Sequence, residues 1–383
     1  MVTAVPPVGT AGGLPRAARR PPRVPALRHL GPNWYACVMG TAIVATAGAA
    51  LPWRVPGLRA ACAAVWVLSL ILLAALLVAR SLHWRHHRDQ ARAHLLDPAA
   101  APFYGCLAMA LLSVGGSALA AGRDLLGVRA AVAVDAVLFT AGTAVAVTVA
   151  VAVPYLMAVH HRIEPGQAGP VWLLPLVAPM VAAAQGPPLA AHLPAGQARE
   201  TLLLACLALF GASLLATLLT LPLILARLLT TGPLPLALTP TLFLVLGPLG
   251  QSTTAVGHLA DAAAPGYAVL AVLYGVPVTG FALLWLALAT AHVVRAGRHG
   301  MGFSMTWWSF TFPVGTCATG AASLTRHTQL AVCAGLTVLL YAVLVAAWGV
   351  AAVRTVRGLV SGELLAAPRP APGAPRPATA RTR

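Results

Sequence analysis

The segment FSMTWWSFTFPVGTCATG, residues 303–320, is apolar enough for a bilayer but carries features that a lipid-facing helix avoids. Pro313 and Gly315 lie in its middle among several threonines, and Phe312 directly precedes the proline. Proline removes a helical hydrogen bond, so inside a membrane the freed carbonyl needs a partner from neighbouring helices, hydroxyls or water. We therefore expect this segment to lie inside a helix bundle, beside a polar path.

The composition of the whole chain indicates a polytopic membrane protein. Hydrophobic residues make up 59% of the 383 residues, charged residues only 9%, and the mean hydropathy is +0.83. Soluble domains are about half apolar and about a quarter charged. The net charge of +17 comes from arginines at the ends of apolar segments and in the tails, so membrane topology accounts for it and nucleic-acid binding is not expected.

Ten apolar segments are long enough to approach the roughly 20 residues that a membrane-spanning helix needs. They predict an all-α integral membrane protein with helices at 34–51, 58–79, 102–121, 130–157, 171–188, 200–226, 239–260, 266–294, 304–324 and 329–353. The transmembrane domain covers residues 31–355. The tails at 1–30 and 356–383 are rich in Pro, Ala and Arg, and we expect them to be disordered.

Arginine placement predicts the orientation. Most arginines fall in the two tails and in the loops that join even-numbered to odd-numbered helices, and the strongest loop signal is Arg80, Arg85, Arg88 and Arg92. Because positive charge is retained on the cytoplasmic side, we expect both termini in the cytoplasm and the protein in the inner (plasma) membrane.

The odd-numbered segments begin at intervals of 65 to 69 residues, which indicates an internal repeat. Four of them open with a four-residue sequence that has proline in second place: GPNW (31–34), APFY (101–104), GPVW (169–172) and TPTL (239–242). The fifth lacks the proline but keeps an aromatic residue, Trp307. Proline suits the first turn of a helix and an aromatic residue suits the membrane interface. The chain is therefore expected to form five helical hairpins.

Glycine and proline separate the two sets of helices. The odd-numbered helices carry them internally at Gly40, Gly115, Gly116, Pro175, Pro179, Gly247, Pro248, Gly250, Pro313 and Gly315. The even-numbered helices mostly do not, although the eighth breaks the pattern with Gly275, Pro277 and Gly280. This pattern predicts that the odd-numbered helices form an inner, kinked set that lines a central pore, with the even-numbered helices outside against lipid.

Three stretches resemble the tellurite-resistance/dicarboxylate transporter family, which includes plant slow anion channels and fungal malate and sulfite transporters. They are GPNWYACVMGTAIVA (31–45), LGPLGQ (246–251) and WWSFTFP (307–313). The resemblance implies a pseudo-fivefold bundle, a pore gated by an aromatic side chain at Phe312, and a homotrimer. Many relatives have Gly-Thr-Gly where this chain has Gly40-Thr41-Ala42. The family's substrates range from chloride, nitrate and tellurite to sulfite and malate, and these motifs do not choose among them.

Polar and small residues on the odd-numbered helices are candidates to line the pore. Hydroxyl and amide donors can replace part of an anion's hydration shell and still release the anion. The alternative is that they bond to backbone carbonyls or neighbouring helices, and that Phe312 is an ordinary packing residue. The candidates beside Phe312 are Gly40, Thr41, Gly115, Pro179, Gln185, Gly247, Gln251, Ser252, Thr311, Pro313 and Thr316.

Charged and titratable residues offer weaker candidates. Asp135 lies in an apolar segment and could relay a proton, but pairing with Arg129 in the membrane interface is the simpler interpretation. The histidines in the run 83–94 are interleaved with arginines, which favours contact with lipid headgroups over a metal site. Arg326 and His327 could draw anions toward the opposite end of the pore or merely mark the interface.

No sequence motif indicates an enzyme. The chain has no GxSxG, HExxH or P-loop, its loops are too short for a catalytic domain, and neither a cofactor nor a metal is expected. The six cysteines lie in apolar segments and are expected to be small buried hydrophobes. The preferred hypothesis is transport of small anions through a gated pore. The alternatives are a proton-coupled carrier of C4-dicarboxylates and, less favoured, a membrane-embedded enzyme or assembly subunit.

Overall fold

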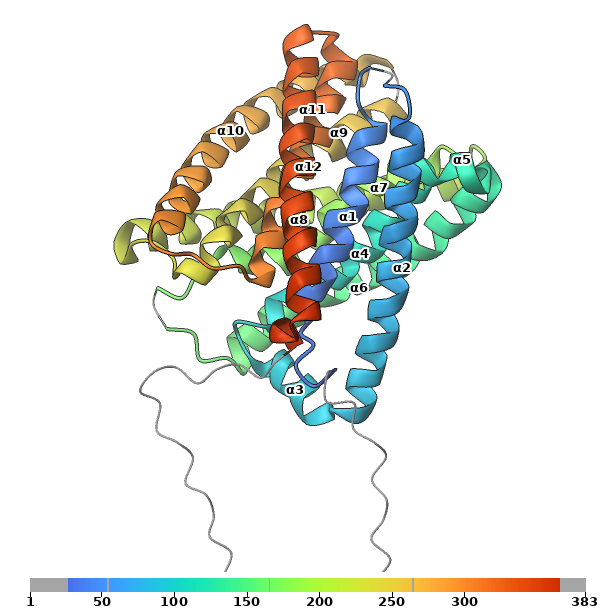
Figure 1. Ribbon diagram of the computed structural model, residues 1–383. Coiled ribbons are helices and arrows are strands. Elements are labelled where there is room, and N and C mark those ends of the chain that lie inside the picture. The colour runs from blue at the N-terminus through green and yellow to red at the C-terminus, as the bar shows by residue number, and fades with distance from the viewer. Residues whose placement is uncertain (1–26, 54, 165, 264, 366–383) are drawn as a thin grey trace, which may run out of the picture.

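A computed structural model describes residues 27–53, 55–164, 166–263 and 265–365, so most of both predicted tails lies outside the described residues. The described chain is helical throughout (Figure 1). Five helices form an inner set: α1 (Tyr35–Ala49), α4 (Gly105–Ser117), α7 (Leu173–Ala190), α9 (Leu246–Ala262) and α11 (Phe312–Thr328). Five longer helices lie outside them: α2 (Leu58–His86), α6 (Val128–Val159), α8 (Gln197–Thr231), α10 (Ala268–Arg298) and α12 (Ala331–Val360).

Each inner helix is extended at its N-terminal end by a 3-10 turn. The five turns are η2 (Pro32–Trp34), η3 (Ala101–Tyr104), η5 (Pro170–Trp172), η6 (Leu236–Val245) and η8 (Met305–Phe310). Pro32, Pro102 and Pro170 lie in the first two positions of their turns, where a missing N–H leaves no intrahelical bond unmade. After α4 the chain continues through a π-helical turn (Ala118–Gly122) into the short helix α5 (Arg123–Leu126).

Among the described residues, seven helices are long and apolar enough to cross a membrane. They are the five outer helices and the segments Ala101–Leu126 and Pro170–Ala190. The other inner helices, α1, α9 and α11, have only 15, 17 and 17 α-helical residues. The chain is thus an all-helical, multi-pass membrane protein, and each of the ten predicted segments coincides with a helix of the structure.

The outer helices continue beyond the ends that hydropathy predicts, and three of them do so by five or more residues. α2 extends to His86 and is followed by the short helix α3 (Arg88–Leu96), α8 extends to Thr231, and α12 extends to Val360. The last turn of α2 contains His83, Arg85 and His86, and the last turn of α12 contains Arg357. Cationic side chains favour the C-terminal end of a helix, which suits the extensions of α2 and α12, whereas the last turn of α8 has no basic residue.

The inner and outer helices differ strongly in burial. In the membrane-crossing windows of the two inner segments, 72% and 83% of the residues are buried, against 17% to 28% in the five outer helices. Large apolar side chains on the outer helices stay exposed, for example Leu219 at 74% and Leu284 at 71%. The predicted division into a buried odd-numbered set and an exposed even-numbered set is therefore present in the packing.

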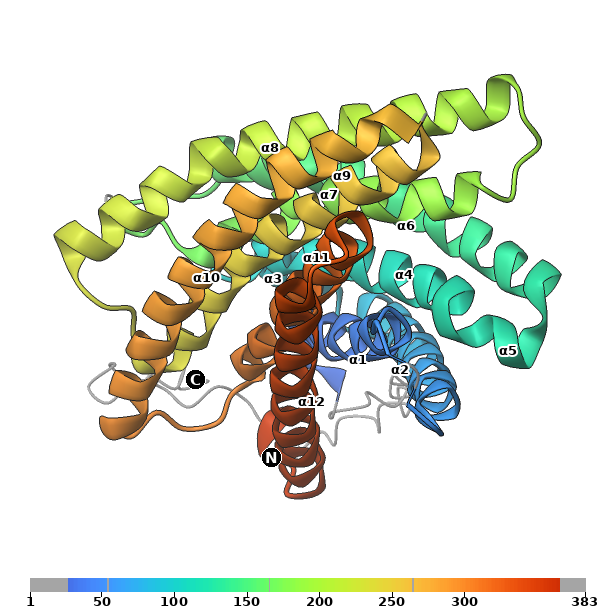
Figure 2. The ribbon, with the colours of Figure 1, turned by 90° about the horizontal axis from the view of Figure 1, so that it is seen from above.

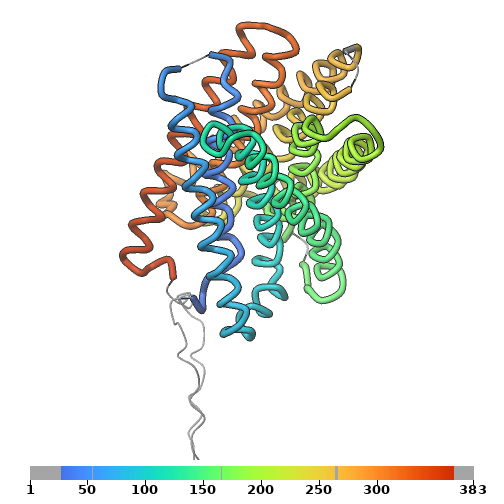
Figure 3. Tube along the Cα trace, turned by 90° about the vertical axis from the view of Figure 1, so that its right-hand side faces the viewer, coloured from blue at the N-terminus to red at the C-terminus, as the bar shows by residue number. Residues whose placement is uncertain are grey.

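The inner helices contact one another in a closed ring, in the order α1, α4, α7, α9, α11 and back to α1. Each outer helix packs on the inner helix that precedes it in the chain, which gives the five predicted hairpins (Figures 2 and 3). Glycines allow the close approaches. An added Cβ at Gly250 of α9 would overlap the backbone of Thr316 and Cys317 in α11. Five of the six cysteines are buried in this packing, and Cys333 is half-buried.

Candidate permeation pathway

All five inner helices or their 3-10 extensions contribute to one small void. Its volume is about 10 Å³, close to the minimum that holds a single water molecule. The side chains around it are apolar, and they leave no continuous passage at this level. The lining residues are Met39, Met109, Leu173, Leu174, Val177, Leu244, Gly247, Phe312 and Pro313.

The void is formed by the same position of each repeat. In each copy of the repeat, the residue five positions after the interfacial aromatic position lies at the void. The starting residues are Trp34, Tyr104, Trp172, Leu242 and Trp307, and the void-lining residues are Met39, Met109, Val177, Gly247 and Phe312. We call these last five residues the constriction layer. The internal repeat of the sequence is thus also a repeat of position around the ring.

Phe312 supplies the largest ring of this layer and is only 2% exposed. It is the first residue of α11, after the chain leaves η8 through Thr311 with φ −95° and ψ −77°. Pro313 follows in the first turn, where its missing N–H is tolerated. On the adjacent helix α9, a Cβ added to Gly247 would meet no atom within 4 Å. The bulky position on α11 therefore lies beside a neighbour, α9, that has no side chain at the equivalent position.

One helical turn beyond the constriction layer, the lining becomes polar. Gln251 follows Gly247 by four residues and Ser113 follows Met109 by four, so each shares a helical face with its constriction residue. The Oε1 atom of Gln251 and the Oγ atom of Ser113 are buried and have no hydrogen-bond partner among the described residues. Thr316, four residues after Phe312, donates to the carbonyl of Pro313 at 2.7 Å. Polar groups that the fold leaves unsatisfied are thus placed next to the apolar constriction.

Several predicted pore residues instead pack between helices. Gly40 lies against Thr311 and Trp308, where an added Cβ would come within 2.9 Å of the Trp308 ring. Thr41 accepts a hydrogen bond from Trp348 of the outer helix α12 at 3.1 Å and so faces away from the ring axis.

The remaining candidates have similarly local surroundings. Gln185 of α7 lies against Gly116 of α4, and Pro179 is buried within α7. Ser252 donates to the carbonyl of Leu249 on its own helix. For these residues, and for Gly40, Thr41 and Thr311, the structure shows contacts within and between helices, and a role in lining the pathway stays a prediction.

Asp135 does not form the predicted ion pair. Arg129 is exposed, and no salt bridge or hydrogen bond to either carboxyl oxygen of Asp135 is present within the described residues. Asp135 is fully buried on α6 and packs against Gly115 of α4, where an added Cβ would lie 2.7 Å from Oδ1. The pairing expectation failed because α6 turns residue 135 toward the inner ring, whereas residue 129 stays at the exposed end of the helix. Gly115 is small because this carboxyl occupies the space beside it.

The histidine-rich run after α2 is also more buried than its sequence suggests. His83 is fully buried and donates from Nδ1 to the carbonyl of Leu27 at 2.8 Å, while Arg80 donates to the carbonyl of Leu30 at 2.6 Å. The rings of His83 and His94 stack with centroids 5.6 Å apart. These residues, which we call the histidine elbow, hold the segment that leads into α1. Contact with lipid headgroups therefore does not account for the buried members of this run.

The sequence-based candidates missed Met39, Met109, Val177 and Ser113 because they were chosen for polarity or helix-breaking character. The constriction layer is apolar, and methionine and valine are ordinary in any membrane helix. The signal that finds them is positional: the fifth residue after each interfacial aromatic position identifies all five at once. Ser113 then follows as the polar residue one turn farther along α4.

Comparison with known proteins assigns the family. Residues 29–356 match the family described as voltage-dependent anion channel (SLAC1). The chain is 24% identical over 347 residues to an uncharacterised transporter of Methanocaldococcus jannaschii, covering 88% of this chain and 96% of that protein. It is 26% identical over 316 residues to sulfite efflux pumps of Trichophyton rubrum and Arthroderma otae, covering 79% of this chain and 83% of each pump.

The family match covers most of the chain, including every inner and outer helix up to the last turns of α12. It agrees with the resemblance carried by residues 31–45, 246–251 and 307–313. The chain therefore belongs to the voltage-dependent anion channel family, a group of membrane transporters and channels rather than of enzymes.

Proposed function

We propose that this protein carries small anions through the axis of its inner helix ring, past a gate formed by Phe312. The observation that carries the proposal is the constriction layer, in which the equivalent residue of all five repeats meets at one void. Phe312 supplies the only aromatic ring of this layer, so movement of that side chain is expected to widen the constriction most. Family membership supplies the substrate class, because the matched family is one of anion channels.

The chemistry of the ring suits a weakly held anion. No Asp, Glu, Lys or Arg lies within one turn of the constriction layer on the inner helices. An anion there would meet hydroxyl and amide groups such as those of Ser113 and Gln251, which bind weakly enough for release. The related sulfite efflux pumps point to small oxyanions such as sulfite as the first substrates to examine, with tellurite, nitrate, chloride and C4-dicarboxylates such as malate beside them.

We further propose that both termini lie in the cytoplasm of the inner (plasma) membrane. The described chain ends lie at the same end of the molecule as the arginine-rich segment that runs from the end of α2 into α3 (Figure 1). Positive charge marks the cytoplasmic side of multi-pass proteins. The homotrimer implied by the family resemblance is retained as part of this proposal.

The test is anion flux into liposomes that contain the purified protein, measured for wild type and Phe312→Ala. Loss of the ring is expected to raise sulfite or nitrate flux by about tenfold or more, equivalent to lowering the barrier by about 1.4 kcal/mol. Phe281→Ala is the matched control, because Phe281 lies on the outer helix α10 and is 41% exposed. Equal fluxes for wild type and both variants would contradict the gate, and absence of flux from all three would contradict anion transport.

A second candidate, a proton-coupled carrier of C4-dicarboxylates, is favoured by Asp135. Its carboxyl group is buried without a partner, and burying an unpaired charge is costly, so the site favours the uncharged, proton-bearing carboxyl. The Asp135 carboxyl packs directly on inner helix α4, so a change in its protonation could be coupled to movement of the inner ring.

Asp135→Asn tests this candidate because asparagine keeps the shape and cannot release a proton. For a coupled carrier, malate uptake driven by a pH gradient is lost, while exchange of malate at equal pH on both sides persists. For a channel, flux is unchanged and independent of the gradient. Thr140→Asn on the exposed face of α6 is the control for adding an amide to this helix.

A further inference from the structure

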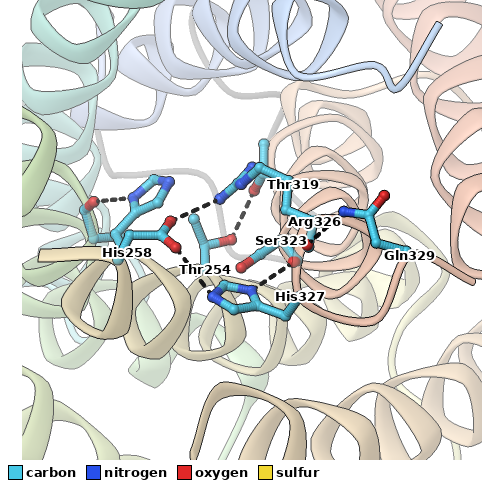
Figure 4. A network of polar contacts seen from close by, with 9 residues as sticks. Thr254, His258, Thr319, Ser323, Arg326, His327 and Gln329 are labelled. Atoms are coloured by element: carbon cyan, nitrogen blue, oxygen red, sulfur yellow. Dashed lines mark hydrogen bonds and ion pairs between the residues drawn. The ribbon is translucent and has the colours of Figure 1, made fainter. Parts of the chain in front are cut away.

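Four charged or titratable side chains meet at the end of the inner ring that is opposite the described chain ends (Figure 4). His258 and Asp261 lie on the last turns of α9, and Arg326 and His327 lie in the last turn of α11. Asp261 bridges the two helices: its Oδ2 atom is 3.4 Å from Nη2 of Arg326, and its Oδ1 atom is 3.1 Å from Nε2 of His327. One carboxylate is therefore held by two donors, one to each oxygen.

Both ring nitrogens of His327 face hydrogen-bond acceptors. Its Nε2 atom lies 3.1 Å from Oδ1 of Asp261, and its Nδ1 atom lies 2.8 Å from the carbonyl oxygen of Ser323. His258 differs, because its Nδ1 atom donates to the carbonyl of Ala184 on α7 at 2.7 Å, and it forms no ion pair with a carboxylate within the described residues. The Asp261 carboxylate thus lies between the guanidinium of Arg326 and the imidazole of His327.

We propose that Arg326 and His327 form a binding site for a small oxyanion, and that the carboxylate of Asp261 occupies this site as an internal competitor. The inference rests on the proposed anion transport, for which the site would be the far mouth of the pathway. Two donors that bind separate oxygens of one group suit an anion with at least two oxygens, such as nitrate, sulfite or a carboxylate. A spherical ion such as chloride can accept from both donors only at a single point, so it cannot place a separate acceptor atom at each donor as a two-oxygen anion does.

The position of the site supports this role. Arg326 and Asp261 are 45% and 48% exposed in their side chains, so an anion from solution can reach them, whereas the His327 side chain is only 6% exposed and is held in place. Below them on the same two helices, the hydroxyl groups of Thr254 and Thr319 hydrogen-bond to each other at 2.9 Å. An anion that displaces Asp261 would next meet these hydroxyls on its way toward the constriction layer.

The experiment measures anion-dependent thermal stabilisation of the full-length protein purified in detergent, with nitrate and chloride at constant ionic strength. A ligand that binds the folded state stabilises it by RT ln(1 + L/Kd), where L is the free ligand concentration, so the melting temperature rises with ligand concentration. Asp261→Asn removes the competitor, and we expect the nitrate concentration needed for a given rise in melting temperature to fall by about tenfold. Arg326→Gln and His327→Gln are expected to lose the response.

His192→Gln is the matched control, because His192 is an exposed histidine just beyond the end of α7 at the same end of the molecule. The proposal is overturned if Asp261→Asn binds nitrate no more tightly than wild type, or if chloride stabilises as well as nitrate. It is also overturned if only vesicles with phosphatidylglycerol give a response, which would assign the site to lipid headgroups. Since binding is measured without transport, a failure here is distinguishable from a failure of the flux test on Phe312→Ala.

Discussion

Glycines affect helix packing differently in the inner ring and in the outer helices. On the inner helices, an added Cβ at Gly105 or Gly250 would overlap the backbone of the next helix. On α10 and α12, Gly280, Gly297, Gly335 and Gly349 have no atom within 4 Å of an added Cβ. The same residue type therefore sets helix-to-helix distance inside the ring and leaves the packing unaffected outside it.

Some glycines depart from this rule, and two of them make its physical basis clearer. Gly247 is on an inner helix but faces open space, because it is the constriction-layer position that leaves room beside Phe312. Gly275 is on outer helix α10, but a Cβ added to it would lie 2.9 Å from side-chain atoms of Thr253 in α9 and Leu324 in α11. The face on which a glycine lies therefore decides its effect. A position that faces a closely packed helix has no room for a side chain, whereas a position that faces the axis or lipid does.

The largest expected effect that sharpens this comparison is at Gly247. In the Phe312→Ala background, Gly247→Val places a branched side chain in the void, and we expect anion flux to fall by about tenfold, a barrier increase of about 1.4 kcal/mol. Gly280→Val is the control on α10, where the added side chain is exposed, and flux should stay at the Phe312→Ala level. Equal losses from both substitutions would mean that Gly247 does not border the pathway.

A smaller effect, on stability, is expected where inner helices touch. Gly250→Ala forces α9 and α11 apart and is expected to lower the free energy of unfolding by about 1–3 kcal/mol, the usual cost of overpacking. Gly335→Ala on α12 meets open space and should be neutral or slightly stabilising, since alanine is the better helix former. Thermal melts of both variants in one detergent provide the comparison, and a stability loss in Gly335→Ala equal to that in Gly250→Ala would break it.

Sequence reasoning found the ten helices and the five hairpins because these depend on apolar length and on a repeat that the chain displays at intervals of 65 to 69 residues. It also selected Phe312, Gly247 and Pro313, which the structure places at the void. It did not separate these from Gly40 and Thr41, because the face of a helix is set by a rotation of about 100° per residue and by the neighbour that packs there. Both residues lie one or two positions from Met39, and they contact Thr311 and Trp308 (Gly40) or Trp348 of α12 (Thr41) instead of the void.

Asp135 and the outer cluster show a second limit. A sequence shows that an acid lies near an arginine, but ion pairing depends on which way each side chain leaves its helix. Asp135 looked paired with Arg129 and has no partner within the described structure, whereas Asp261 and Arg326, 65 positions apart, form an ion pair. Contacts between repeats required the structure because they join equivalent ends of different hairpins.

The smallest expected effect concerns the end of the outer helix α2, where Arg80 and His83 of the histidine elbow are buried. Burial lowers the pKa of His94 on α3, and the charges of Arg80, His83 and His29 act in the same direction against a weaker opposing effect of Asp97. A histidine whose pKa is lowered in the docked elbow binds fewer protons in that state than in the undocked, solvent-exposed state. Its docking is therefore complete above the ordinary histidine pKa of about 6.5 and weakens as the pH falls below it.

We expect amides in residues 27–30 and 88–96 to exchange hydrogen faster at about pH 5.5 than at about pH 7.5, after correction for intrinsic rates, because an open elbow exposes them to solvent. His94→Gln should remove this pH dependence, and His299→Gln at the exposed end of α10 should keep it. If the exchange were the same at both pH values in wild type, buried imidazoles would not hold the elbow closed. Contacts other than buried imidazoles would then hold the end of α2, among them the bonds of Arg80 to the Leu30 carbonyl and to Tyr104.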